Sequence, residues 1–429
     1  MISHDLDRDD DTSVVHAVFS LIQERHANPI TRLHTIMSDF IENQNTDDDG
    51  MVEIETSVSQ IRRGLTSHSV GSQQQVCRTA VAACLGLALL MVSAPAHAQY
   101  QLTNLVSNQI DEQAPNTDPL LVNAWVLARG ATTPWWVSDN LSGWSTLYGG
   151  TGTPQGLKVL IPTAGNGPSS PKGLNGPGTP TGVVFNRSKT DFNIKDNQSV
   201  FIFATLDGTV SAWAPGVSVN QAIIAVDNSA KKAMYTGLAI TSKRSGNFLY
   251  AADNTDNRVD IFNGAFELVK SFGDPNIPSN FSVFGIQVIN DLVYVAYAIP
   301  NAGAGGFIDV FEEDGTLVKT LIHGLPLNQA WGIALAPGNF GPLSNTLLVS
   351  NNSTGGTING FDPNTGEFVG TIKDGQGNAI TFTNAWGIAF GGGNSANWAE
   401  NELFVTAGPG KGAQSQLAGT FASIVFPNL

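Results

Sequence analysis

The stretch Gln-Ala-Trp-Gly-Ile-Ala at residues 329–334 returns as Asn-Ala-Trp-Gly-Ile-Ala at 384–389. An earlier copy at 123–128 reads Asn-Ala-Trp-Val-Leu-Ala, and weaker copies lie at 180–184, 235–239 and 283–286. The six copies align on Val126, Gly182, Gly237, Gly285, Gly332 and Gly387, which are 56, 55, 48, 47 and 55 residues apart. Self-similarity with a period of about fifty residues predicts a repeat architecture.

Further apolar runs follow the first run in each copy. Many are rich in Val, Ile, Phe and Tyr, and turn pairs such as Asp207-Gly208 and Asp314-Gly315 separate them. This pattern is typical of β-strands joined by tight turns. Six repeats of four strands each match the strand count of a six-bladed β-propeller. We therefore expect an all-β fold over residues 99–429, a six-bladed β-propeller of four-stranded blades.

The sixth repeat is one strand short, and one spare strand stands ahead of the first repeat. The last apolar run is 420–426, whereas residues 101–106 alternate in hydrophobicity before the first Ala-Trp copy. This N-terminal strand can complete the sixth blade, which closes the ring and leaves no open edge between the first and last blades. A two-sheet sandwich, the other architecture considered, does not explain six copies in register.

Two sets of residues resemble known propeller sequences. Residues 248–262, Phe-Leu-Tyr-Ala-Ala-Asp-Asn-Thr-Asp-Asn-Arg-Val-Asp-Ile-Phe, look like an NHL repeat. The segments 104–108, 123–125, 136–140 and 178–184 resemble a bacterial family of secreted, uncharacterised six-bladed propellers. The resemblance covers about residues 99–429 of the chain. It implies the fold and export, but it implies no established activity.

The N-terminal segment predicts export. Residues 79–92 are apolar and uncharged, too short for a membrane span but suited to a signal peptide, and Ala96-His97-Ala98 favours cleavage before Gln99. We interpret 65–98 as a signal peptide, with a buried helix and a lipoprotein signal at Cys84 as alternatives. Residues 1–64 form an acidic extension, which reflects either a start downstream at Met51 or an unusually long leader. The expected location is periplasmic or extracellular, without stable membrane insertion.

Composition limits the chemistry. Charged residues make up 13 % of the 429-residue chain and the net charge is −15, which argues against a nucleic-acid partner because phosphate binding needs a basic surface. Residues 99–429 contain no cysteine and one histidine, His323. A zinc site of His and Cys ligands is excluded there. A Ser-His-Asp triad could use only His323, which a surface turn explains as well.

Carboxylate and amide side chains end the second strand of three repeats, in the pairs Asp139-Asn140, Asp253-Asn254 and Asn351-Asn352. Such hard oxygen ligands suit Ca²⁺. Gluconolactonase-type propellers place one divalent metal near the tunnel with residues of this kind, so the resemblance implies a metal at Asp139, Asn140, Asp253, Asn254 and Asn351. The alternative is that these residues form Asx-turns at strand ends.

Three tryptophans precede the inner strands of three repeats, and we expect them near the axis at one end of the ring. Trp125, Trp331 and Trp386, with Asn123 and Asn384 beside them, could line a pocket for a sugar, a peptide or another small molecule. The alternative is that the indoles pack between blades.

We expect two kinds of function for this fold. The leading hypothesis is an exported, monomeric, non-enzymatic propeller that acts as a rigid binding scaffold. The alternative is a hydrolase or lyase with a carboxylate-bound Ca²⁺ at the propeller axis. Fold alone does not decide between them, because propellers carry out both kinds of function.

Overall fold

The computed structural model describes residues 99–109, 114–164, 177–241, 246–299, 303–408 and 418–427. The chain divides into two units, Met1–Pro95 and Ala96–Leu429, and all the described residues belong to the second. The predicted signal peptide and acidic extension therefore lie outside the described residues, apart from the predicted cleavage position at Gln99. No helix among the described residues is long and apolar enough to cross a membrane.

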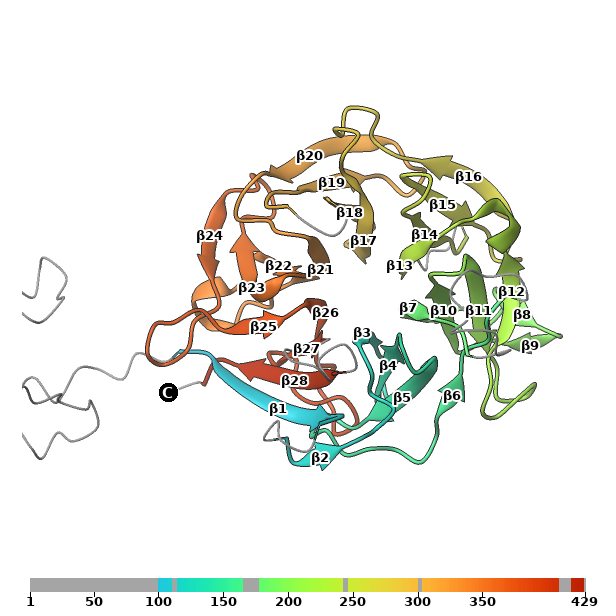
Figure 1. The fold of residues 1–429 in the computed structure, drawn as a ribbon, viewed down its shortest axis with the longest axis horizontal. Helices are drawn as coiled ribbons and strands as arrows, with labels where there is room; N and C mark the ends of the chain where they lie inside the picture. Colours follow the sequence, from blue (N-terminus) through green and yellow to red (C-terminus); the bar gives the residue numbers. More distant parts are fainter. Residues whose placement is uncertain are drawn as a thin grey trace, which may run out of the picture. The chain divides into compact units, whose positions relative to one another are not determined.

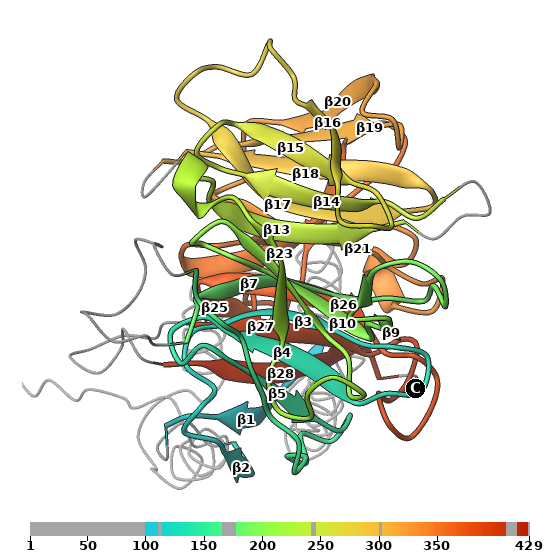
Figure 2. The same ribbon diagram turned by 90° about the vertical axis from the view of Figure 1, so that its right-hand side faces the viewer.

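Six antiparallel sheets form a ring, as the repeats predicted (Figure 1). We number the sheets as blades 1 to 6 from the first Ala-Trp copy onward. The first strand of each blade lies nearest the centre, and each first strand contacts those of the two neighbouring blades around the whole ring. Figure 2 shows the same ring from the side. The prediction of a six-bladed β-propeller is confirmed.

Each blade has four consecutively paired strands. Blades 1 to 3 consist of β3 (Ala124–Ala128), β4 (Trp135–Asp139), β5 (Trp144–Tyr148) and β6 (Val159–Leu160); β7 (Pro180–Phe185), β10 (Phe201–Thr205), β11 (Thr209–Trp213) and β12 (Ile223–Asp227); and β13 (Tyr235–Ile240), β14 (Leu249–Asp253), β15 (Arg258–Phe262) and β16 (Leu268–Phe272). A separate two-stranded ribbon, β8 (Asn193–Ile194) and β9 (Asn197–Gln198), joins two strands of blade 2.

Blades 4 to 6 follow the same order. They consist of β17 (Ser282–Ile289), β18 (Leu292–Ala298), β19 (Phe307–Phe311) and β20 (Leu317–His323); β21 (Ala330–Leu335), β22 (Leu347–Asn351), β23 (Thr354–Phe361) and β24 (Phe368–Thr371); and β26 (Ala385–Phe390), β27 (Leu403–Ala407), β28 (Thr420–Val425) and β1 (Gln101–Ser107). Two short strands extend these sheets: β25 (Thr381–Thr383) pairs with β23, and β2 (Asn116–Thr117) pairs with β1.

The ring closes through its N-terminal strand, as the strand count predicted. β1 runs antiparallel to β28, with Leu102 opposite Ile424 and Val106 opposite Phe421. Figure 1 shows β1 as the outermost long strand of this sheet, next to β28. Since the last blade combines both ends of the described chain, separating its strands would open the ring.

Glycine recurs in the first strands because neighbouring blades come very close at the centre. A Cβ atom on Gly285 would lie 2.0 Å from the carbonyl oxygen of Trp331, and one on Gly332 would lie 2.4 Å from that of Trp386. Neither position can carry a side chain without displacing the backbone of the next blade. Blade 1 has Val126 at this position, and its half-buried side chain packs against the tryptophans at the axis.

The apolar core lies between the blades. One cluster combines Val259 of blade 3 with Val293 and Val295 of blade 4, and another combines Trp136 of blade 1 with Phe201 of blade 2. Each blade thus buries the faces of its sheet against its two neighbours. This burial is the main apolar contribution to the stability of the ring.

Candidate functional site

The predicted site residues all lie at one end of the ring. Strand pairing sets the start of each first strand beside the end of the second strand, with Ala124 opposite Asp139, Ala330 opposite Asn351, and Ala385 opposite Ala407. The residues that precede the Ala-Trp copies therefore share this end with the Asp and Asn residues that end the second strands. We call it the Ala-Trp end of the ring.

The three tryptophans form one cluster at the axis. Trp125 and Trp386 stack with ring centroids 3.8 Å apart, and Trp331 meets Trp386 edge-on at 6.0 Å. Phe284 of blade 4 packs against Trp386 at 5.7 Å. The exposed fractions of the three indoles are only 5–6 %. These side chains are packed against one another, and their predicted role in ligand binding stays a prediction.

The indoles also reach across to neighbouring blades. The indole nitrogen Nε1 of Trp331 donates to the carbonyl oxygen of Thr236 at 3.2 Å, and Nε1 of Trp386 donates to that of Gly408 at 2.6 Å. Nε1 of Trp125 is buried without a hydrogen-bond partner. The indole of Trp331 in blade 5 thus extends to blade 3 and bonds to its backbone.

The backbone conformation explains why asparagine precedes the Ala-Trp copies at Asn123 and Asn384. Their backbone φ angles are 52° and 55°, and Gln329 in blade 5 has φ 54°. Few side chains tolerate this left-handed region, and asparagine is several-fold enriched in it. The carbonyl oxygens of Asn123 and Asn384 accept hydrogen bonds from the backbone nitrogens of Asn140 and Gly408, both at 3.2 Å.

Three asparagines connect neighbouring blades, and we call them the asparagine clips. Each directly follows the second strand of its blade, and its side-chain Nδ2 donates to a carbonyl oxygen at the first strand of the next blade. The donor–acceptor pairs are Asn140 to Pro180 at 3.1 Å, Asn254 to Val283 at 2.7 Å, and Asn352 to Ala385 at 3.5 Å. Two of the predicted metal ligands, Asn140 and Asn254, are thus engaged in joining blades.

The other predicted metal ligands, Asp139, Asp253 and Asn351, form hydrogen bonds with backbone atoms. Oδ2 of Asp139 accepts from the Thr146 nitrogen at 3.1 Å, and Oδ1 of Asp253 accepts from the Met234 nitrogen at 3.1 Å. Asn351 accepts from the Asn328 nitrogen at 2.9 Å and donates to the Pro326 carbonyl oxygen at 2.9 Å. They lie in blades 1, 3 and 5, and no contact between them is found among the described residues.

Burial perturbs both of these aspartates. Burial raises the pKa of Asp139 well above its usual range; hydrogen bonding from Thr146 lowers it and the Asp118 carboxylate raises it. Burial also raises the pKa of Asp253, while the Met234 backbone lowers it. Perturbed carboxylates mark active sites, but buried structural networks shift pKa values in the same way. The described part of the chain contains no group of three or more His, Cys, Asp or Glu side chains that could hold a metal ion.

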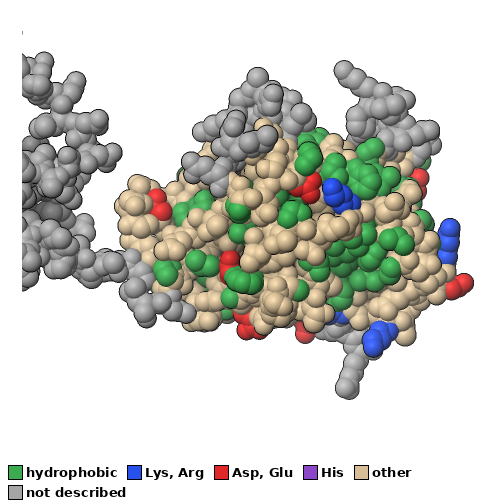
Figure 3. All heavy atoms as spheres, turned by 90° about the horizontal axis from the view of Figure 1, so that it is seen from below, with side chains coloured by type: hydrophobic (Ala, Val, Ile, Leu, Met, Phe, Trp, Pro, Cys, Tyr) green, Lys and Arg blue, Asp and Glu red, His purple; other side chains and the backbone are tan. Residues whose placement is uncertain are grey.

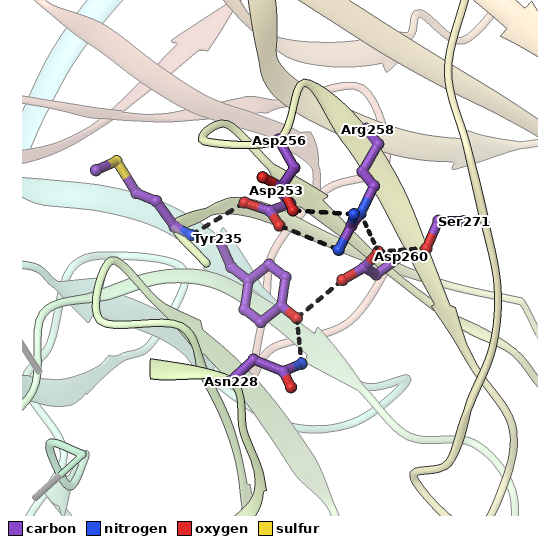
Figure 4. Close-up of polar contacts among 8 residues, drawn as sticks. Asn228, Tyr235, Asp253, Asp256, Arg258, Asp260 and Ser271 are labelled. Carbon is purple, nitrogen blue, oxygen red and sulfur yellow. Dashed lines mark hydrogen bonds and ion pairs between the residues drawn. The ribbon is translucent and has the colours of Figure 1, made fainter. Parts of the chain in front are cut away.

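The most extensive polar network lies in blade 3 and centres on Asp260 (Figure 4). Its carboxylate accepts from the Tyr235 hydroxyl at 3.1 Å, the Ser271 hydroxyl at 2.6 Å and Nε of Arg258 at 2.8 Å. Asn228, from the connection between blades 2 and 3, donates to the Tyr235 hydroxyl at 2.7 Å. Both carboxylate oxygens of Asp260 thus accept hydrogen bonds, and these bonds fix the geometry of the blade around it.

Arg258 provides the positive charge of this network. Its guanidinium lies 2.8 Å from Asp260, 2.9 Å from Asp256 and 3.8 Å from Asp253. Asp253 and Asp260 are buried, whereas Asp256 is 43 % exposed and Arg258 is 36 % exposed. Arg258, which is partly exposed, thus neutralises the buried carboxylates of Asp253 and Asp260.

Of these residues, the sequence assigned a role only to Asp253, as a predicted metal ligand, whereas Asp256, Arg258 and Asp260 stood out only through the resemblance to an NHL repeat. The sequence signal that could have indicated their contact is the spacing of Arg258 and Asp260. They are two residues apart on one strand, so both side chains lie on the same face of the sheet. The partners Tyr235 and Asn228 come from other strands and connections. Tyr235, on β13 of the same blade, donates to Asp260, and Asn228 donates to Tyr235 from the connection between blades 2 and 3.

Comparisons with known proteins identify relatives but no family, since no family model matches the chain. Uncharacterized protein R640 of Acanthamoeba polyphaga mimivirus is 31 % identical over 229 residues, which are 49 % of this chain and 42 % of that relative. The chain thus spans less than half the length of R640. Uncharacterized protein R648 of the same virus is 28 % identical over 326 residues, 72 % of this chain and 76 % of the relative. These viral relatives do not support the bacterial family that the sequence resembled.

Solved structures with a similar fold include enzymes of different kinds. A gluconolactonase of Xanthomonas campestris is 14 % identical with a TM-score of 0.48, and the match covers 78 % of this chain and 93 % of that one. Virginiamycin B lyase of Staphylococcus aureus is 12 % identical with a TM-score of 0.46, and the match covers 77 % and 99 %. At these values the likeness says nothing about the activity of this chain.

Proposed function

We propose that this chain is an exported, monomeric binding scaffold and not an enzyme. The observation that carries the proposal is the use of the asparagine clips: two of the three amides expected to hold a metal at the Ala-Trp end, Asn140 and Asn254, donate to the backbone of the next blade. Residues that hold the ring together make a rigid frame, and a rigid frame lowers the entropic cost of presenting a binding surface. The apolar segment 79–92 supports export.

The ligand that fits this frame is uncharged, a neutral glycan or peptide. Charged residues are only 13 % of the sequence, and on the side of the ring seen in Figure 3 apolar patches lie among scattered charged side chains. Amide side chains at the Ala-Trp end, such as that of Asn384, suit hydrogen bonding to such a ligand. The hydrolase or lyase alternative gains no specific support from the described residues.

The test is a binding screen with a variant that preserves the backbone. The purified chain is applied in EDTA to an array of neutral and charged glycans and peptides, and bound probes are recovered for mass spectrometry. Asn384→Gly removes one amide at the axis, and glycine tolerates the positive φ of 55°. Asn345→Gly, at an exposed position with φ 61°, is the matched control.

We expect binding of an uncharged probe that is insensitive to EDTA, weakened by Asn384→Gly and unchanged by Asn345→Gly, with the probe recovered intact. Chemical conversion of a probe that stops in EDTA would support the enzyme instead. Binding to charged probes alone, or to none, would also contradict the proposal.

A further inference from the structure

Blades 3 and 4 share a polar position but differ in what surrounds it. Asp260 is the third residue of β15 and lies opposite Ser271; Asp309 is the third residue of β19 and lies opposite Thr320. In blade 3, Arg258 stands two residues before the aspartate and neutralises it. In blade 4, Phe307 has that place. The second buried aspartate of blade 3, Asp253, is replaced by Tyr297 at the corresponding strand position.

A second carboxylate enters blade 4 from the connection that leads into it. Asp274 follows β16, and it is 8 % exposed. Blade 3 has the neutral Asn228 on the corresponding connection after β12. Blade 4 therefore gains an acidic group where blade 3 has an amide and loses the arginine. Neither Asp274 nor Asp309 has an ion-pair partner among the described residues.

The buried groups of blade 4 lack the partners that their equivalents have. Asp309 is fully buried, and neither carboxylate oxygen has a hydrogen-bond partner of good geometry. The hydroxyl of Tyr297 is also fully buried without a partner. Burial raises the pKa of Asp309 to about 6; the nearby Thr320 hydroxyl lowers it, and the Asp274 carboxylate raises it. Burial and the Asp309 charge raise the pKa of Tyr297.

We propose that Asp274 and Asp309, with the hydroxyl of Tyr297, form a binding site for a divalent cation, Ca²⁺. Two carboxylates balance the charge of one such ion. The donors are all oxygen atoms, which calcium takes in groups of six to eight with waters and carbonyls completing the shell. Nitrogen and sulfur donors, which transition metals prefer, are lacking in this cluster. The ion would supply the positive charge that Arg258 supplies in blade 3.

This proposal is independent of the binding function, because the cluster lies in blade 4 and shares no residue with the axis cluster. It also differs from the metal predicted from the sequence, which used residues of blades 1, 3 and 5. The competing explanation is that Asp309, whose pKa burial raises, carries a proton. That state needs no metal, and its stability depends on pH.

The test is thermal unfolding of the purified full chain after treatment with chelator, over a range of CaCl₂ concentrations. Asp309→Asn keeps the shape of the side chain and removes one ligand charge. Glu312→Gln removes an equal charge from an exposed residue of the same blade and serves as the control. Far-UV circular dichroism verifies that each variant folds, and equilibrium dialysis measures the bound calcium.

We expect the melting temperature to rise with CaCl₂ in the unmodified chain and in Glu312→Gln, and to stay constant in Asp309→Asn, because only ligands that bind the folded state stabilise it. Dialysis should show calcium retained by the first two proteins and lost from the third. A melting temperature that changes with pH but not with CaCl₂ would overturn the proposal in favour of a protonated Asp309. An equal response to CaCl₂ in Asp309→Asn would overturn it as well.

Discussion

Trp386 is the residue with the most contacts at the axis. It stacks on Trp125 at 3.8 Å, meets Trp331 and Phe284, and donates to the Gly408 carbonyl oxygen. Replacing it with alanine leaves a cavity at the meeting point of several blades. We expect Trp386→Ala to lower the free energy of unfolding by about 3–5 kcal/mol, measured by denaturant titration.

The control for Trp386 is Trp398, whose side chain is 41 % exposed. Trp398→Ala should change the free energy of unfolding by less than about 1 kcal/mol, as for other exposed positions. If Trp386→Ala unfolds like the unmodified chain but no longer binds a ligand, the indoles form a binding pocket and their packing contributes little to stability.

Glu402 makes stability depend on pH. It is 7 % exposed, and burial raises its pKa above the usual 4.5 while the Ser423 hydroxyl lowers it. The folded state therefore holds this proton more tightly than the unfolded state, and the stability that protonation provides is lost as pH rises through the raised pKa. We expect Glu402→Gln to stabilise the chain at neutral pH.

The pH dependence of that effect separates it from a general gain in stability. Urea titrations at about pH 4 and about pH 7 should show a larger gain for Glu402→Gln at the higher value, because the raised pKa of the folded state makes ionisation of the unmodified side chain cost stability as pH rises. Glu400→Gln, at an exposed neighbouring position, should show no such difference. Equal gains at both values would contradict the role assigned to burial.

The asparagine clips show what could be predicted for single residues. The sequence placed Asn140 and Asn254 at the ends of second strands, which is where they lie. It could not distinguish a metal ligand from a hydrogen-bond donor, because the acceptor carbonyls of Pro180 and Val283 belong to the next blade. That distinction depends on how close two blades come, and close approach appears in the sequence only as a repeated glycine.

Among the strands, β1 has the greatest consequence for the ring because it completes blade 6. It buries Leu105 and Val106 and pairs with β28 along most of its length. Deleting residues 99–108 would remove this pairing and leave an open strand edge. We expect the deleted protein to aggregate and to lose its cooperative unfolding transition, measured by calorimetry and light scattering.

The deletion also removes Tyr100, whose hydroxyl donates to the Phe340 carbonyl oxygen at 2.7 Å and accepts from the Leu343 nitrogen at 3.1 Å. Tyr100→Phe isolates these two bonds and should cost about 1–3 kcal/mol while keeping cooperative unfolding. If the deletion costs no more than Tyr100→Phe does, β1 is not the strand that holds the ring closed.

Most strands could be predicted, and the exceptions are the short ones. The apolar runs after each Ala-Trp copy correspond to the strands of every blade, and the closing strand followed from counting. β2 and β25 were missed because strands of two or three residues carry no alternation to detect. Both exist only through pairing with longer strands, β1 and β23.

Across the whole ring, the asparagine clips alternate. Asn140, Asn254 and Asn352 stand in blades 1, 3 and 5, whereas the residues after the second strands of blades 2 and 6 are Leu206 and Gly408. The ring thus consists of three pairs of blades, 1 with 2, 3 with 4 and 5 with 6, and one clip joins the two blades of each pair. The repeat of about fifty residues predicted the individual blades. The longer period of two blades became visible only from the hydrogen bonds of the asparagine clips.

The measurement that tests this account most directly is the thermal unfolding of Asn254→Asp in EDTA and in CaCl₂. Aspartate keeps the oxygen that a metal would bind and removes the amide donor to the Val283 carbonyl oxygen, now 2.7 Å away. Asn364→Asp adds the same charge at an exposed position and is the control. If the clip joins blades, Asn254→Asp loses about 1–3 kcal/mol of stability whether or not calcium is present, and the control does not. If Asn254→Asp is as stable as the unmodified chain in EDTA, or becomes as stable as the unmodified chain when both are in the same CaCl₂ concentration, this residue is a metal ligand and the scaffold proposal is wrong.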